Sequence, residues 1–84
     1  MKMLELENIL INSKIPLEFY SLKGGLPNEE FCIGYQNQQW EVYYSEHGHK
    51  SSLKIFSSEE DACEYFYKRL IEGLESQFGK RYTS

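Results

Sequence analysis

The sequence has little positive charge and no long apolar run, and each of these absences excludes a class of function. Nine Lys and Arg stand against thirteen Asp and Glu, which gives a formal net charge of −4. A negative field repels phosphate backbones, and phosphate contacts supply much of the affinity of nucleic-acid-binding proteins. We therefore expect no nucleic-acid partner and favour a basic one.

No apolar segment approaches the roughly 20 residues that a helix needs to cross a bilayer. At the N-terminus, acidic residues interrupt the apolar ones in the sequence Met-Lys-Met-Leu-Glu-Leu-Glu-Asn, a pattern that does not fit a signal peptide. The sequence thus predicts a cytoplasmic protein without a membrane partner.

Cysteine and histidine are scarce, and their spacing offers little chemistry. Cys32 and Cys63 have the spacing of neither a metal knuckle nor a redox pair, so we expect two buried, reduced thiols. His47 and His49 could present two imidazoles to one metal, but a stable site needs three or four ligands. We expect no metal, no cofactor and no enzymatic activity.

Aromatic residues, in contrast, are abundant, with seven Tyr, five Phe and one Trp among 84 residues. The alternation of apolar and polar residues, broken by turn residues, predicts a sheet, and helical spacing predicts a helix on each side of it. We expect a single α+β domain in which a three-stranded antiparallel meander lies between an N-terminal helix and a long amphipathic C-terminal helix packed on one sheet face. The expected bounds are about 3–13 and 58–78 for the helices, and about 31–35, 40–45 and 52–56 for the strands.

Turn and capping residues support these boundaries. Ser58 precedes three acidic residues, which is typical of a helix N-terminus, with Ser57 and Glu60 as an alternative capping box. Gly48 suits a left-handed turn position, and Gly79 is a plausible C-cap. The segment 17–22 mixes both periods and stays undecided, whereas 24–28 is a loop rich in Gly and Pro.

Regular alternation assigns the strand residues to two faces. Those expected beneath the helices are Ile33, Trp40, Val42 and Ile55. Those expected on the uncovered face are Glu41, Tyr43 and Lys54. An exposed aromatic face with acidic neighbours is typical of a protein-binding surface.

Several segments together resemble a group of small bacterial immunity proteins encoded beside large secreted polymorphic toxins, including some toxins whose toxic domain consumes NAD. The resemblance covers roughly residues 15–72. The segments that carry it are Tyr20-Ser21-Leu22, Gly24-Gly25-Leu26-Pro27-Asn28-Glu29, Trp40-Glu41-Val42-Tyr43-Tyr44-Ser45-Glu46 with Gly48, Phe56, and Ser58-Glu59-Glu60-Asp61-Ala62-Cys63.

The resemblance implies a non-enzymatic inhibitor that binds and neutralises one cognate toxin domain in the cytoplasm. Residues on or beside the face expected to be uncovered are the candidate contacts: Glu41, Tyr43, Glu46 and His47. The group usually has Arg where this chain has His47. If that Arg contacts the partner in the group, the contact is altered or lost in this chain. We expect a monomer; the alternatives are an adaptor for another cytoplasmic protein or a homodimer formed through a strand edge.

Overall fold

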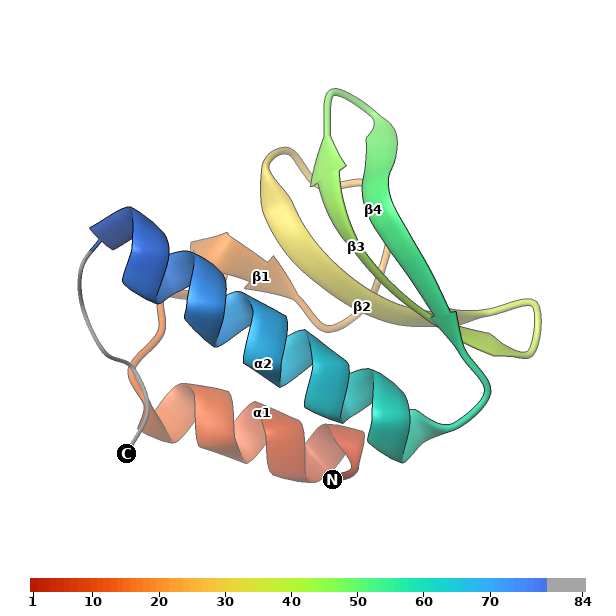
Figure 1. The fold of residues 1–84 in the computed structure, drawn as a ribbon, viewed down its shortest axis with the longest axis horizontal. Coiled ribbons are helices and arrows are strands. Elements are labelled where there is room, and N and C mark those ends of the chain that lie inside the picture. Colours follow the sequence, from red (N-terminus) through yellow and green to blue (C-terminus); the bar gives the residue numbers. More distant parts are fainter. Residues whose placement is uncertain (79–84) are drawn as a thin grey trace.

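The computed structural model describes residues 1–78, with side chains up to residue 75. Its elements, shown in Figure 1, follow one another along the chain. They are α1 (Met3–Asn12), a 3₁₀ turn (Leu17–Phe19), β1 (Tyr20–Ser21), β2 (Glu30–Gln36), β3 (Gln39–Glu46), β4 (His49–Phe56) and α2 (Glu59–Phe78). The strands form one sheet in the order β1-β2-β3-β4.

The expected α+β architecture is confirmed, with one helix before the strands in the chain and one helix after them. The expectation of three strands, all antiparallel, is wrong in one respect. The sheet has a fourth strand, β1, which pairs parallel with β2 through Tyr20 opposite Phe31 and Ser21 opposite Cys32. A strand of two residues is too short to show an alternating pattern, which is why the segment 17–22 could not be assigned.

Helix α2 packs on one face of the sheet, against β2, β3 and β4. Its start is capped as expected, because the Ser58 hydroxyl accepts a hydrogen bond from the Asp61 N–H at 3.0 Å. Phe66 lies at the centre of the interface, fully buried, and its ring stacks on Phe31 with centroids 5.1 Å apart. The expected C-cap, Gly79, lies outside the described residues. No helix within residues 1–78 is long and apolar enough to span a bilayer.

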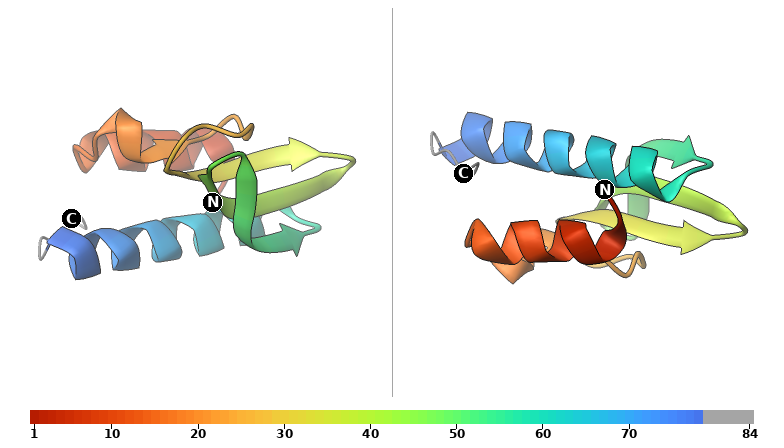
Figure 2. Two further views of the ribbon diagram at one scale, coloured as in Figure 1. Left: turned by 90° about the horizontal axis from the view of Figure 1, so that it is seen from above. Right: turned by 90° about the horizontal axis from the view of Figure 1, so that it is seen from below.

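Helix α1 lies beside α2 and runs in the same direction, as both views in Figure 2 show. Leu6 and Leu10, one turn apart, are fully buried and join the core, as expected for the apolar face of an amphipathic helix. The two helix starts are tied together, since the Met3 N–H donates to Glu59 Oε2 at 2.7 Å. This carboxylate satisfies a backbone donor that the first turn of a helix leaves unpaired.

Two tight turns connect the three long strands. Asn37 and Gln38 join β2 to β3, and His47 and Gly48 join β3 to β4; all four have positive φ, between 50° and 76°. Two residues with positive φ characterise the hairpin turn whose twist matches that of the strands. The expected left-handed conformation of Gly48 is confirmed.

The assignment of faces on β4 was wrong because β4 contains one extra residue. Val42 pairs with Lys54 while Tyr44 pairs with Ser51, so the register shifts at Ser52, whose φ is 55°. A bulge of one residue reverses the alternation beyond it. Lys54 therefore lies opposite buried Val42, and Ile55 lies opposite Glu41 and is 46% exposed.

The second face of the sheet is covered by the loop 22–29, contrary to the expectation that Glu41, Tyr43 and Lys54 share an open face. The Tyr43 hydroxyl donates to the Gly25 carbonyl and the Ser45 hydroxyl to the Pro27 carbonyl, each at 2.6 Å. Tyr43 is only 1% exposed as a result. The loop thus covers one face of the sheet, and α2 covers the other.

The loop meets the sheet where two glycines face each other. The Gly24 N–H donates to the Ile33 carbonyl at 3.0 Å, which brings the loop backbone against β2. A Cβ placed on Gly34 would lie 2.8 Å from the Gly24 Cα, closer than real contacts allow. Position 34 therefore needs glycine because of this approach, and its φ is not positive.

We expect Gly34→Ala to destabilise the protein by about 1–3 kcal/mol, because the added methyl group forces the loop backbone away from β2. Gly73→Ala in α2 is the matched control. A Cβ there meets nothing within 4 Å, so the same change should stabilise the helix by about 0.5–1 kcal/mol. Urea unfolding measures both values. Equal stabilities of Gly34→Ala and the parent protein would mean that the loop does not pack on β2.

Candidate functional site

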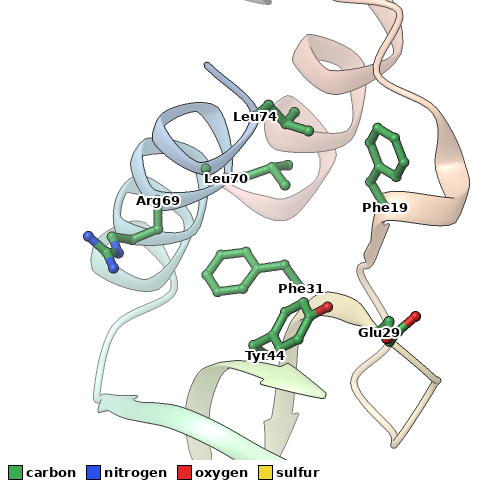
Figure 3. Close-up of a pocket in the computed structure, with 8 residues that line it drawn as sticks. Phe19, Glu29, Phe31, Tyr44, Arg69, Leu70 and Leu74 are labelled. Atoms are coloured by element: carbon green, nitrogen blue, oxygen red, sulfur yellow. The ribbon is translucent and has the colours of Figure 1, made fainter. Parts of the chain in front are cut away.

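A groove opens between α2 and the sheet, with a volume of about 350 Å³. Figure 3 shows most of the side chains around it. We call it the α2 groove, and its lining residues are Phe19, Glu29, Phe31, Tyr44, Arg69, Leu70, Gly73 and Leu74.

The walls of the α2 groove come from both covering layers. Phe31 and Tyr44 are cross-strand partners, so their side chains emerge on the same face of the sheet. Leu70 and Leu74 lie one turn apart on α2, and each is 5% exposed. Since Phe31 also stacks on buried Phe66, the apolar wall is fixed by the core and does not depend on a ligand.

Gly73 leaves the groove open on the helix side. It lies inside a helix, where glycine costs about 0.5–1 kcal/mol relative to alanine. Steric crowding does not explain why position 73 is a glycine, because a Cβ there would meet no atom within 4 Å. The missing side chain keeps this part of the groove wall open.

The rim of the groove is charged, and the charge nearest the sheet is acidic. Burial raises the pKa of the Tyr44 phenol, and the charges of Glu29 and Glu46 raise it further, so the phenol stays protonated at neutral pH. The positive charge of Arg69 is largely balanced by a neighbouring carboxylate. Its guanidinium extends away from the cavity in Figure 3 and lies 3.3 Å from the Glu72 carboxylate.

Two of the four predicted contact residues, Glu41 and Tyr43, lie on the other face of the sheet. The Glu41 side chain is 12% exposed and pairs with the Lys50 ammonium at 2.7 Å, and this ammonium lies 4.7 Å from the centre of the Tyr43 ring. Together with the hydrogen bond from Tyr43 to Gly25, these contacts hold the loop face together. The prediction that Tyr43 is exposed is wrong, and the buried ring has no surface to offer a partner.

The other two, Glu46 and His47, lie at the end of β3 near the groove. Glu46 is on the same face as Tyr44, two residues away, and accepts a hydrogen bond from the Ser51 hydroxyl at 3.1 Å. His47 is exposed in the following turn. The structure therefore separates the predicted set into a structural pair and a pair beside the α2 groove.

Phe31, Tyr44 and Gly73 were missed as site residues. Tyr44 lies on the helix-covered face at its boundary, where it is partly exposed, and the alternation of apolar and polar residues does not mark such a boundary position. The sequence does mark Gly73 as unusual, because glycine in the interior of a helix has a low helix propensity. Nothing in the sequence marks Phe31 as a site residue, because its position in the strand pattern is the same as that of a core residue.

The two cysteines lie in surroundings that suppress thiol chemistry. Both are fully buried, and burial raises the pKa of Cys32 and of Cys63 to about 11. The neighbouring charges of Glu30 and Glu59 add to the respective shifts. A nucleophilic cysteine needs a lowered pKa and access to solvent, and neither thiol has them. In the part of the chain that the structure describes, no three His, Cys, Asp or Glu side chains are grouped to hold a metal ion.

Comparisons of the chain with protein-family models, with curated proteins and with solved structures give no match.

The thiols provide a direct test of this burial. At pH 8, moving a pKa from 9.0 to about 11 lowers the thiolate fraction by about a hundredfold. We expect Ellman's reagent to modify both cysteines at least that much more slowly in the native protein than in concentrated urea. The native rate should still be rising at pH 10. Rapid native modification in Cys32→Ser or Cys63→Ser would show that the remaining thiol is exposed.

Proposed function

We propose that this protein is a non-enzymatic immunity protein that binds a cognate bacterial toxin domain in the cytoplasm and neutralises it. One observation carries the proposal beyond the sequence resemblance. A preformed groove with aromatic and aliphatic walls adjoins the charged end of the β3–β4 hairpin, where Glu46 and His47 lie. Rigid apolar pockets with a polar rim are typical of the central contacts of protein interfaces.

The size of the groove supports a protein ligand. Its volume of about 350 Å³ is at the lower end of the range for small-molecule sites, which is roughly 300–1,000 Å³, and suits one or two side chains. A stable interface buries about 800 Å² on each partner, roughly one seventh of the 5606 Å² of this protein. The interface must then extend past the groove, and the hairpin end is the adjacent surface.

The net charge of −4 supports a basic partner, because opposite charge accelerates association and disfavours unsuitable partners. In this proposal Glu46 contributes to the interface directly. Tyr43 acts at a distance, through its hydrogen bond to the loop whose last residue is Glu29, and Glu41 holds Lys50 beside the Tyr43 ring.

The adaptor and the strand-edge homodimer remain the alternatives, and the outer edge of β4 bears on the second. The bulge at Ser52 interrupts that edge, and Lys50 and Lys54 flank it. Bulges and lysines on an edge strand oppose pairing with another strand. We therefore propose a monomer.

The first experiment is titration calorimetry against the C-terminal toxin domain encoded next to this protein, with an assay of toxin activity in the same mixture. We expect one-to-one binding with a nanomolar Kd and loss of toxin activity. Glu46→Gln should weaken binding by about tenfold, which corresponds to ~1.4 kcal/mol. Glu5→Gln, an exposed carboxylate on α1, is the control and should leave the affinity unchanged.

Absence of both binding and protection would exclude immunity toward that toxin. Binding without loss of activity would favour the adaptor.

A further inference from the structure

We infer that the α2 groove binds an apolar side chain that the partner presents next to a Lys or Arg, with the apolar group beside Gly73 and the cation at Glu29. The identity of the partner rests on the proposed function. The ligand chemistry of the groove rests on the groove alone.

Gly73 leaves space for a ligand on the helix side of the groove. Among the residues that line the groove, Gly73 has no side chain, and its Cβ position is open. Leu70 and Leu74, which also line the groove, extend from α2 on the side that faces Phe19, as Figure 3 shows. An incoming apolar group can therefore occupy the position that a longer residue at 73 would fill.

The sheet side of the groove has an aromatic wall, formed by Phe31 and Tyr44. Phe31 is held by its stacking on Phe66, and Tyr44 is paired with Phe31 across the strands. Aromatic faces attract both apolar groups and cations, since the ring carries negative charge on its face. A ligand that combines the two types of group can use the whole wall.

The negative charge of Glu29 at the groove is available to a cation. Within the described residues, the Glu29 carboxylate takes part in no ion pair, whereas Glu41 and Glu59 are paired with lysines. Glu29 and Glu46 also act together on Tyr44, so this end of the groove is acidic. Among the described residues that line the groove, the one cation is Arg69, which is already paired with Glu72. The unbalanced charge of the groove is therefore negative, and a cation complements it.

The position of Glu29 is fixed, as a recognition residue requires. It ends the loop 22–29, which is tied to β3 through the bonds from Tyr43 to Gly25 and from Ser45 to Pro27. Glu29 itself has a φ of 58° and directly precedes β2. The backbone at Glu29 therefore has little conformational freedom left to lose when a cation binds, and this favours affinity.

The test uses phenethylamine, a phenyl group with an ammonium, as the probe in ¹⁵N NMR titrations of the full chain. For so few atoms we expect a Kd of the order of 10 mM, with the largest shifts at the amides of Phe31, Tyr44 and Gly73. The matched anion, 3-phenylpropionate, should bind at least about fivefold more weakly, because it meets the charges of Glu29 and Glu46.

Two variants separate the two parts of the inference. Gly73→Ala fills the space while leaving the fold at least as stable, and we expect it to weaken phenethylamine binding at least about fivefold. Glu29→Gln should remove the preference for the amine over the acid. Glu64→Gln, an exposed carboxylate on α2 that does not line the groove, should change neither result.

The inference is wrong if phenethylamine causes no clustered shifts at the groove, if Gly73→Ala binds it as well as the parent protein does, or if the acid binds equally well. Its failure can be told apart from failure of the proposed function. If the toxin domain binds the parent protein and Gly73→Ala with equal affinity, immunity stands and the groove is not its site. If the probe binds as expected and no toxin domain does, the groove stands and immunity fails.

Discussion

The closure of the second face of the sheet depends on two hydrogen bonds from strand side chains to loop carbonyls. Residues 1–78 contain two α-helices, and one of them, α2, covers a single face of the sheet. The other face carries Tyr43 and Ser45, whose hydroxyls donate to loop carbonyls and exclude solvent from that face. The glycine at position 34 makes the approach sterically allowed. Because the loop ends at Glu29, the contacts that close one face of the sheet also position a carboxylate at the groove on the opposite side.

Much of the fold could be predicted from local patterns. Both helices, the three long strands, the Ser58 cap and the left-handed Gly48 follow from periodicity and from short-range hydrogen bonding, which depend on neighbouring residues. The errors have a different origin. The bulge at Ser52 reverses the faces of Lys54 and Ile55, and nothing in the alternation of Leu, Lys and Ile marks an inserted residue. The coverage of Tyr43 by the loop depends on tertiary contacts between residues 18 positions apart, which no local pattern records.

The candidate site was accessible to prediction only in part, for a related reason. Glu46 and His47 could be proposed because they flank a recognisable turn. The groove beside them is assembled from the 3₁₀ turn, the loop, two strands and the second half of α2, elements that meet only in the folded chain. The helix-interior glycine at position 73 is the one groove residue whose local cost is visible in the sequence. Conversely, Tyr43 was chosen for its chemistry, and an amphipathic side chain suits a buried hydrogen bond as well as an interface.

The contact between Met3 and Glu59 spans 56 positions and joins the first helix to the last. A helix of ten residues is marginal on its own, because nucleation is unfavourable and few hydrogen bonds follow it. The buried residues of α1 find their partners on α2, so α1 gains most of its stability only when α2 is present. During synthesis on a ribosome, α1 must wait until α2 has emerged, more than 40 residues later. The order in which the helices are made is thus the reverse of the order in which they can become stable.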